Sequence, residues 1–436
     1  MRAPFLLPRY NGTMSPALIS YEEAAARVRS YAEGILDASL PATERVMLHQ
    51  AAGRVLARPL IADRDQPSFP RSTRDGFACR ATEASQHMPL VIAGSSRAGD
   101  APGGPLPTGS AWEIMTGAAV PEGADAVMMV EHVEVRAGNV RLFAPRTLQA
   151  GENVVPRGAE ARTGAELLGP GTVISAAQIA LAAFCGAAEL DVFLRPRVAI
   201  LCTGDEIVPV EAEPRPGQIR NSNGPMLATL VAAAGGEPWL LPTAADSARA
   251  LEESIRNALE SADLLLITGG VSAGKFDLVE PALERFGAAF HFTGIYMQPG
   301  KPTVFGEVPR TGTNPNRDKD GTKCCFFGLP GNPISSAVTF LLYAAPVLAA
   351  LAGRRDTLPR FVTARLVKDV RHAPGLTRFL PALCTFGSGA EWPRVELVPW
   401  QGSGDLAAFA RSNCFLVLPE DKESFPAGSE ARILLP

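Results

Sequence analysis

The chain has 436 residues, of which 46% are hydrophobic, so it can bury more than one core, and its length indicates roughly three domains. Its formal net charge of -4 provides no general attraction for nucleic acid or for an anionic membrane surface. Seven cysteines without a C-x-x-C pair favour free thiols over zinc ligation or disulfides, and no apolar run is long enough to predict a membrane span. We therefore expect a cytoplasmic protein that binds neither nucleic acid nor membranes.

The N-terminal part predicts an α/β segment that is interrupted by a β domain. Ser20 and Glu23 form a capping-box pattern ahead of a helix that ends near Ala38, and a short helix is expected at 48–52. Residues 63–150 contain short apolar or alternating runs separated by Gly and Pro, which is typical of a small β domain. Residues 151–190 contain more β sequence and a helix at 175–184. They can pack with 20–62 if the β domain is an insertion.

Residues 191–358 alternate strands and helices, a pattern that predicts a doubly wound α/β domain with a parallel sheet. The expected strands are 197–202, 237–241, 263–267, 288–297 and 325–327, and the expected helices are 224–234, 246–261, 277–286 and 334–351. Residues 309–323 form a polar connection. Short strands resume after residue 359 and predict a C-terminal β domain.

Three glycine-containing loops follow apolar runs that predict buried parallel strands. They are 203–206 (TGDE), 269–275 (GGVSAGK) and 328–333 (GLPGNP). The carboxyl ends of parallel strands share one edge of a sheet, and glycine amides close to helix starts favour anions. The loops therefore predict one cleft for a phosphorylated or oxyanionic ligand. Asp205 and Glu206 suit Mg²⁺, although acidic residues are also common in turns and at helix starts.

Two of these segments have competing interpretations. Residues 269–275 match the phosphate-loop pattern G-x-x-x-x-G-K, but Phe276 occupies the place of the Ser or Thr that would ligate Mg²⁺. We interpret the match as convergent, with a nucleotide hydrolase as a rival, and Ser272 can still hold an oxyanion. Lys301, between two prolines in 298–302, is either an oxyanion contact or a solvated lysine.

Seven collinear motifs from about residue 20 to the C-terminus resemble those of the molybdopterin molybdenumtransferase family (MoeA and the gephyrin E domain). The matching segments are 72–78 against the family pattern S-x-M-D-G-Y-A, 115–117 with 121–123, 203–206, 269–272, 299–302, 328–333, and 401–404 with 413–414. Departures from the family pattern are Lys275 in place of an acid, Gln298 in place of a frequent lysine, and Arg74 in place of Met.

The resemblance implies a multidomain α/β plus β fold. Its parts are an elongated N-terminal α/β segment (20–62 and 151–190), an inserted β domain (63–150), a molybdopterin-binding α/β domain (191–358) and a barrel-like C-terminal β domain (359–436). It also implies a homodimer with a cleft built from both subunits. The implied reaction consumes adenylylated molybdopterin and molybdate with Mg²⁺, and yields molybdenum cofactor and AMP. A molybdopterin adenylyltransferase is a candidate partner.

The resemblance also assigns residues to roles. Asp75, Glu206 and Lys301 are the catalytic candidates, and Glu206 and Asp277 are the metal ligands. Ser272, Lys301, Arg378 and Ser403 are expected to hold molybdate. The full set of substrate-binding candidates is Thr116, Asp205, Asp246, Gly269, Gly270, Ser272, Gly331, Asn332, Arg378 and Ser403.

Two alternatives come from the same relatives. A molybdopterin adenylyltransferase shares the α/β domain, but it is a short single-domain protein without counterparts of 20–190 and of the C-terminal β domain. A noncatalytic scaffold is the second alternative, because the gephyrin E domain also anchors a receptor. The acids at Asp75, Glu206 and Asp277 argue against a scaffold, whereas Lys275 keeps it open.

Overall fold

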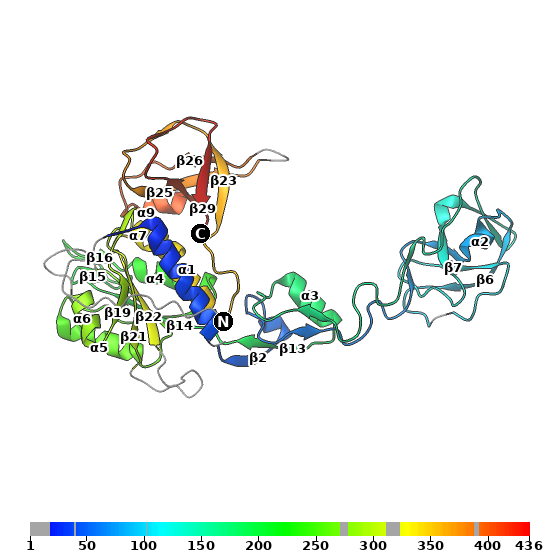
Figure 1. Cartoon of the computed structure of the whole chain (residues 1–436), viewed down its shortest axis with the longest axis horizontal. Helices are drawn as coiled ribbons and strands as arrows, with labels where there is room; N and C mark the ends of the chain where they lie inside the picture. Colours follow the sequence, from blue (N-terminus) through cyan, green and yellow to red (C-terminus); the bar gives the residue numbers. More distant parts are fainter. Residues whose placement is uncertain (1–17, 39–40, 102, 271–277, 311–322, 388–391) are drawn as a thin grey trace, which may run out of the picture.

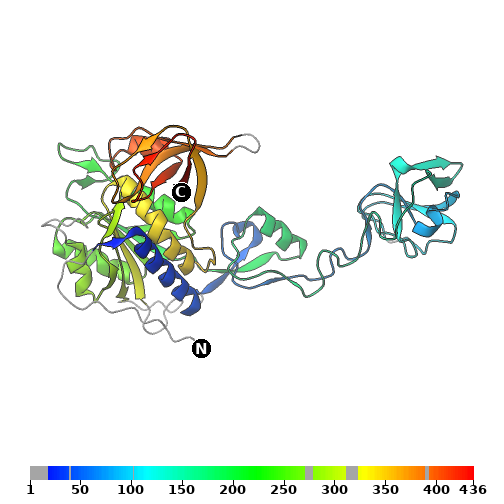
Figure 2. The same cartoon turned by 45° about the horizontal axis from the view of Figure 1, so that its top comes forward.

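The computed structural model describes residues 18–38, 41–101, 103–270, 278–310, 323–387 and 392–436, and the molecule is elongated. An α/β domain and a C-terminal β domain lie side by side at one end, and a small β domain lies at the other end of a thin arm (Figure 1). A second view agrees with this arrangement (Figure 2). Segments near residues 75 and 116 therefore lie far from the α/β domain within one subunit.

The α/β domain is built on a six-stranded sheet in the order β17-β14-β18-β22-β21-β19. The first four strands are parallel, and β21 and β19 continue the sheet antiparallel. Their bounds are β14 Arg197–Cys202, β17 Glu237–Leu240, β18 Leu264–Thr268, β19 Ala289–Phe292, β21 Val304–Pro309 and β22 Lys323–Leu329, with a short pair β15 Ile207–Val208 and β16 Ile219–Arg220 beside them.

Alternate residues of the central strands belong to two different cores. Val198 and Ile200 of β14 pack in one core, whereas Ala199 and Leu201 pack in the other. The sheet is therefore covered on both faces, which explains why its strands are uninterrupted apolar runs. The helices are α1 Tyr21–Ala38, α4 Asn223–Ala233, α7 Pro333–Thr339 and α8 Ala345–Leu351 against the first core, and α5 Ala248–Leu259 and α6 Val279–Arg285 against the second.

A π-helical turn, η3 Phe340–Ala344, joins α7 to α8, so Pro333–Leu351 is one helical stretch. This stretch is the one candidate for a membrane span among the described residues, by length and composition, and 83% of its most apolar window is buried inside the fold. Its apolar residues serve the core. All seven cysteines are buried free thiols, as the sequence predicts.

The prediction of one strand at 288–297 is wrong. The strand is interrupted at Thr293 and Gly294. The residues after the interruption form β20 Ile295–Gln298, which lies outside the six-stranded sheet and pairs with β1 Ile19–Ser20 and with β25 of the C-terminal domain. Strand β21, which the sequence did not predict, fills the place beside β22.

The C-terminal domain is a closed five-stranded barrel in the order β25-β26-β23-β29-β27, because β27 also pairs with β25. The strands are β23 Phe361–Leu366, β25 Thr377–Thr385, β26 Arg394–Leu397, β27 Cys414–Leu418 and β29 Glu430–Leu434, with a small pair β24 Val370–Arg371 and β28 Ser424–Phe425, and helix α9 Leu406–Arg411. This closure agrees with the predicted barrel-like fold.

The arm consists of two chain segments that run antiparallel. Three two-stranded ladders join them, in which β2 Thr43–Met47 pairs with β13 Glu189–Phe193, β3 Leu60–Ile61 with β12 Glu166–Leu168, and β4 Arg71–Ser72 with β11 Val154–Val155. The 3-10 turn η1 Leu48–Gln50 replaces the short helix expected at 48–52, and α3 Ala176–Phe184 packs beside it. The predicted domain boundaries remain predictions.

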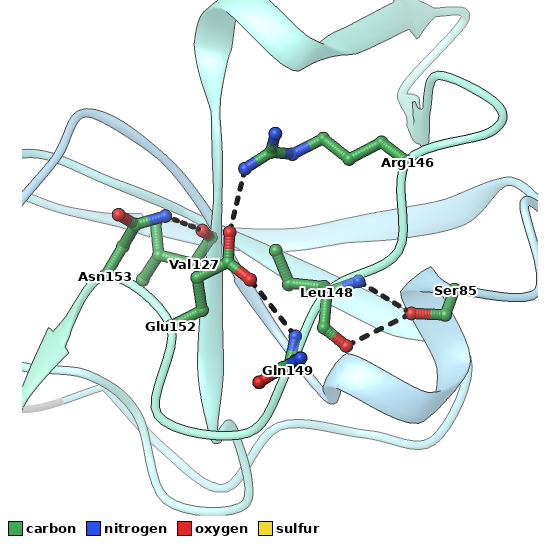
Figure 3. A network of polar contacts seen from close by, with 7 residues as sticks. All are labelled: Ser85, Val127, Arg146, Leu148, Gln149, Glu152 and Asn153. Atoms are coloured by element: carbon green, nitrogen blue, oxygen red, sulfur yellow. Dashed lines mark hydrogen bonds and ion pairs between the residues drawn. The ribbon is translucent and has the colours of Figure 1, made fainter.

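The distal β domain is a six-stranded sheet in the order β8-β5-β7-β6-β10-β9. Its elements are β5 Gly76–Cys79, α2 Ala81–Ala84, β6 Leu90–Ser96, β7 Ser110–Ile114, β8 Ala126–Met129, η2 Val130–His132, β9 Val133–Arg136 and β10 Asn139–Leu142. Figure 3 shows the contacts that hold residues 146–153, the segment that leads from this domain back into the arm. Glu152 accepts bonds from Arg146 Nη2 at 2.8 Å and from the Gln149 amide at 3.1 Å, and Asn153 Nδ2 donates to the Val127 carbonyl at 2.9 Å.

Candidate functional site

The carboxyl ends of β14, β18 and β22 lie at one level of the sheet. Cys202, Thr268 and Leu329 are paired in register across the three strands, so the loops that follow them leave the sheet together. We call this region the sheet-end site, and define it as residues 203–206, 246, 269–270, 331–332 and 403.

Two glycines allow close approaches at this edge of the sheet, one between the first two loops and one within the first loop. Gly269 has a φ of +93°, and a Cβ at this position would lie 2.6 Å from the carbonyl oxygen of Thr203. Gly204 has a φ of +140°, and a Cβ there would lie 2.6 Å from a carboxylate oxygen of Glu206. At Gly269 a Cβ would force backbone to move, whereas at Gly204 the flexible end of Glu206 could move instead, and the positive φ favours glycine at both positions. The Gly331 loop completes the arrangement, because its Cβ position lies 3.7 Å from the Gly269 Cα.

Carboxylates line the outer side of the sheet-end site. The Asp246 amide donates to Asp205 Oδ1 at 3.0 Å, and the Asp205 amide donates to Asp246 Oδ2 at 3.4 Å, so the two loops hold each other. Asp205, Glu206 and Asp246 are all exposed. Beside them, Thr203 is 7% exposed, and its Oγ1 has no hydrogen-bond partner among the residues that the structure describes. Thr203, Asp246 and Gly270 line a small hollow.

The donor set at this rim suits a hard cation. Mg²⁺ prefers oxygen ligands, and it is commonly bound by one or two carboxylates together with substrate phosphates. Asp205, Glu206 and Asp246 supply such oxygens. Within the described ranges, no group of three acidic, His or Cys side chains is placed to hold a metal ion by itself.

The third loop is connected to the barrel. Asn332 Nδ2 donates to Ser403 Oγ at 2.8 Å, and the Ile334 amide donates to the Ser403 carbonyl at 3.1 Å. Asp405 fixes the Ser403 loop, because its carboxylate accepts from the amides of Ala408 at 2.9 Å and Gln401 at 3.1 Å. These amide bonds lower the pKa of Asp405 below its ordinary 3.8, the Ala408 amide contributing most.

Lys301 and Arg378 lie where the α/β domain meets the barrel. Arg378 is in β25, opposite Gln298 of β20, and exposed Lys301 follows β20 in the next turn. The carbonyl of Lys301 accepts a bond from the Ile295 amide at 2.9 Å, which fixes the turn. The guanidinium Nε of Arg378 is buried and has no partner in the described part of the chain. Such a donor requires an acceptor, and an oxyanion would provide one.

Asp75 and Thr116 form a separate group on the distal β domain. Asp75 Oδ1 accepts from the Thr116 amide at 2.6 Å and from its hydroxyl at 2.8 Å. Both bonds lower the pKa of Asp75 below 3.8, and the bond from the Thr116 amide contributes most to this shift. A hollow of about 260 Å³ on the same face is lined by Asp75, Met115 and apolar residues of β9. Within one subunit this pair lies far from the sheet-end site (Figure 1).

The structure thus brings together most of the predicted residues, but not all of them. Asp205, Glu206, Asp246, Gly269, Gly270, Gly331, Asn332 and Ser403 share the sheet-end site. Ser272 and Asp277 lie outside the described residues. No sequence signal assigns a role to Asn223 or Asp405, because an Asn or Asp at the start of a helix is usually an ordinary cap.

The four-part architecture and three family comparisons place the chain in a class of multidomain proteins that contain a probable molybdopterin binding domain. Residues 19–186 match "MoeA N-terminal region (domain I and II)", 199–350 match "Probable molybdopterin binding domain", and 363–435 match "MoeA C-terminal region (domain IV)".

Individual relatives extend the match over nearly the whole chain. A molybdopterin molybdenumtransferase from Nostoc is 34% identical over 90% of this chain and 88% of its own length. One from Haemophilus influenzae is 32% identical over 90% of this chain and 93% of its own. The crystal structure of a molybdopterin biosynthesis moeA protein from Pyrococcus horikoshii has a TM-score of 0.76 at 28% identity, covering 96% of this chain and 100% of that one. The chain belongs to the MoeA family of molybdopterin molybdenumtransferases.

Proposed function

We propose that this chain inserts molybdenum into molybdopterin in the synthesis of molybdenum cofactor. The finer form of the proposal is that it uses adenylylated molybdopterin, molybdate and Mg²⁺, and releases AMP. The observation that carries it is the meeting of the 203–206, 269–270 and 331–332 loops at the ends of three parallel strands, because glycine-rich backbone and a carboxylate rim suit a phosphorylated substrate with its cation.

The residues divide into two chemical roles. Glu206, together with Asp277 as the family resemblance implies, would hold Mg²⁺, which when bound neutralises negative charge on a phosphate anhydride, and the exposed carboxylates of Asp205 and Asp246 add negative charge at the same rim. Lys301 and Arg378, with the Ser403 hydroxyl, would hold molybdate at the junction with the barrel. The buried Nε of Arg378 supports this division, since it has no acceptor among the described residues.

We further propose a homodimer in which the distal β domain of one subunit completes the sheet-end site of the other. Asp75 and Thr116 match family motifs but adjoin β5 and β7 of the distal β domain, which lies at the far end of the arm from the α/β domain that contains Glu206 (Figure 1). A symmetric pair of elongated subunits, packed so that each arm reaches its partner, would bring the two groups together twice.

The proposal also includes a cellular location and a protein partner for this chain. Seven buried free thiols suit a reducing compartment, which supports a cytoplasmic location. A molybdopterin adenylyltransferase is a candidate partner because it would supply the adenylylated substrate. We expect neither nucleic acid nor a membrane to bind.

The test is release of AMP from adenylylated molybdopterin by the purified chain with Mg²⁺, in the presence and absence of molybdate. We expect release that depends on molybdate. Glu206→Ala should abolish it, whereas Lys301→Ala should mainly raise the molybdate concentration required. Equal activity in both variants would refute these roles, and no release by the unaltered chain would favour the scaffold alternative.

A further inference from the structure

Asn223, the first residue of α4, bridges two loops of the sheet-end site. Its Nδ2 donates to Thr268 Oγ1 at 2.9 Å and to the Gly331 carbonyl at 2.7 Å. The Gly331 carbonyl can only accept, so the side chain must present its NH₂ group there, and this fixes the orientation of the amide. Both protons of the NH₂ group are therefore committed to holding the end of β18 against the loop that follows β22.

A buried hydroxyl pair continues the bridge. Thr268 Oγ1 donates to the Pro330 carbonyl at 3.2 Å and lies 3.3 Å from Ser336 Oγ, which also donates to that carbonyl. Thr268 is 2% exposed and Ser336 is fully buried. Water cannot readily replace a bond lost here, so each partner depends on the others for its hydrogen bonds.

The bridge acts directly on the glycines of the site. Gly269 follows Thr268, and Gly331 follows Pro330, so a shift of either bridged residue changes the spacing between the two glycine loops. That spacing is small, with 3.7 Å between the Gly269 Cα and the Cβ position of Gly331. Asn223 Oδ1 is itself buried without a partner in the described part of the chain. Leaving this buried acceptor unpaired costs free energy, and the two hydrogen bonds of the NH₂ group offset that cost.

We infer that Asn223 is a positioning residue, which holds the 269–270 and 331–332 loops at the separation that receives the phosphate end of adenylylated molybdopterin. The inference rests on the proposed function. Molybdate binding depends on Asn223 only indirectly, through Asn332 and its bond to Ser403, and less strongly, because Asp405 also fixes the Ser403 loop.

The test compares Asn223→Ala, Asn223→Asp and a control, Asn257→Ala, at an exposed position of α5. Asn223→Asp keeps the shape of the side chain but places an acceptor against the Gly331 carbonyl. We expect both Asn223 variants to raise the KM for adenylylated molybdopterin about tenfold, as for a lost buried hydrogen bond, with smaller changes in kcat and in the KM for molybdate. Amide hydrogen exchange should quicken in 266–270 and 328–336, and the control should match the unaltered chain.

Three outcomes would overturn the inference. A folded Asn223→Asp variant with unaltered KM would mean that only the volume of the side chain matters. A rise in the molybdate KM as large as that for adenylylated molybdopterin would mean that the whole site has moved. If the unaltered chain releases no AMP, the proposed function is wrong, but hydrogen exchange still tests the positioning role of Asn223. Exchange that is unchanged in both segments of the Asn223 variants would refute that role.

Discussion

Asn332 and Ser403, 71 residues apart in the chain, are joined by a 2.8 Å hydrogen bond from Nδ2 to Oγ. Asn332 belongs to the loop that starts α7, and Ser403 belongs to the loop before α9. This bond connects the α/β domain to the barrel at the sheet-end site, and it orients the hydroxyl that we assign to molybdate.

We expect Asn332→Ala to raise the KM for molybdate about fivefold, the usual effect of losing one hydrogen bond of about 1 kcal/mol. The effect on adenylylated molybdopterin should be smaller, because the Asn223 bridge to Gly331 is intact. Steady-state kinetics with each substrate varied in turn provide the measurement. A variant with an unchanged molybdate KM would contradict the assignment of Ser403.

The proposed cleft between two subunits predicts complementation between inactive variants. Asp75→Asn and Glu206→Gln should each abolish AMP release as homodimers. If the subunits are mixed after mild dissociation, half of the dimers carry one cleft without either substitution, and activity should return to about a quarter of the unaltered level. A mixture that stays inactive would show that Asp75 and Glu206 do not share a cleft across the dimer, provided that mass analysis shows that subunits exchanged.

The sheet-end loops could be predicted from the sequence because a strand covered on both faces is an uninterrupted apolar run, and β14, β18 and β22 all have this property. The split at Thr293 could not be predicted. Residues 295–298 alternate between buried and exposed positions because β20 pairs with β1 and β25, and those partners are far away in the chain.

The large distance between Asp75 and Glu206 within one subunit could not be predicted from the sequence either. Motif order along a chain does not encode the length of an arm, and the three short ladders that build it leave almost no periodic pattern. The Asn223 bridge was missed for a different reason. Its partners are a carbonyl group and a threonine that any strand end could contain, so only their positions in space identify it.

The Asp75–Thr116 pair predicts a pH-dependent contribution to stability. Thr116 lowers the pKa of Asp75 below 3.8 in the folded chain, so the ionised form is the one that folding favours. The stabilisation is present in full above pH 3.8 and is lost as the pH falls through the lower folded pKa. Thr116→Val removes the hydroxyl donor and raises the pKa of Asp75 towards 3.8.

Thermal midpoints of the unaltered chain and Thr116→Val, measured from neutral to acidic pH, would check this. We expect the unaltered chain to have the higher midpoint at neutral pH, and the difference to narrow as Asp75 becomes protonated. Thr108→Val, at an exposed turn of the same domain, is the control. A difference between the Thr116 variant and the unaltered chain that stays constant down to the lowest pH would rule out the Asp75 carboxylate as its source.

Gly269 and Gly235 provide a matched test of the contact between the first two loops. Their φ angles are +93° and +92°, so alanine at either position costs roughly 1–2 kcal/mol of backbone strain. A Cβ at Gly235 meets open space, whereas a Cβ at Gly269 would lie 2.6 Å from the Thr203 carbonyl, which must then move.

We expect both variants to lose similar thermal stability from strain, with an additional loss for Gly269→Ala. Only Gly269→Ala should also lose most AMP release, because displacement of Thr203 shifts Asp205 and Glu206 relative to the other loops. If Gly235→Ala lost as much AMP release as Gly269→Ala, general destabilisation rather than loop contact would explain both.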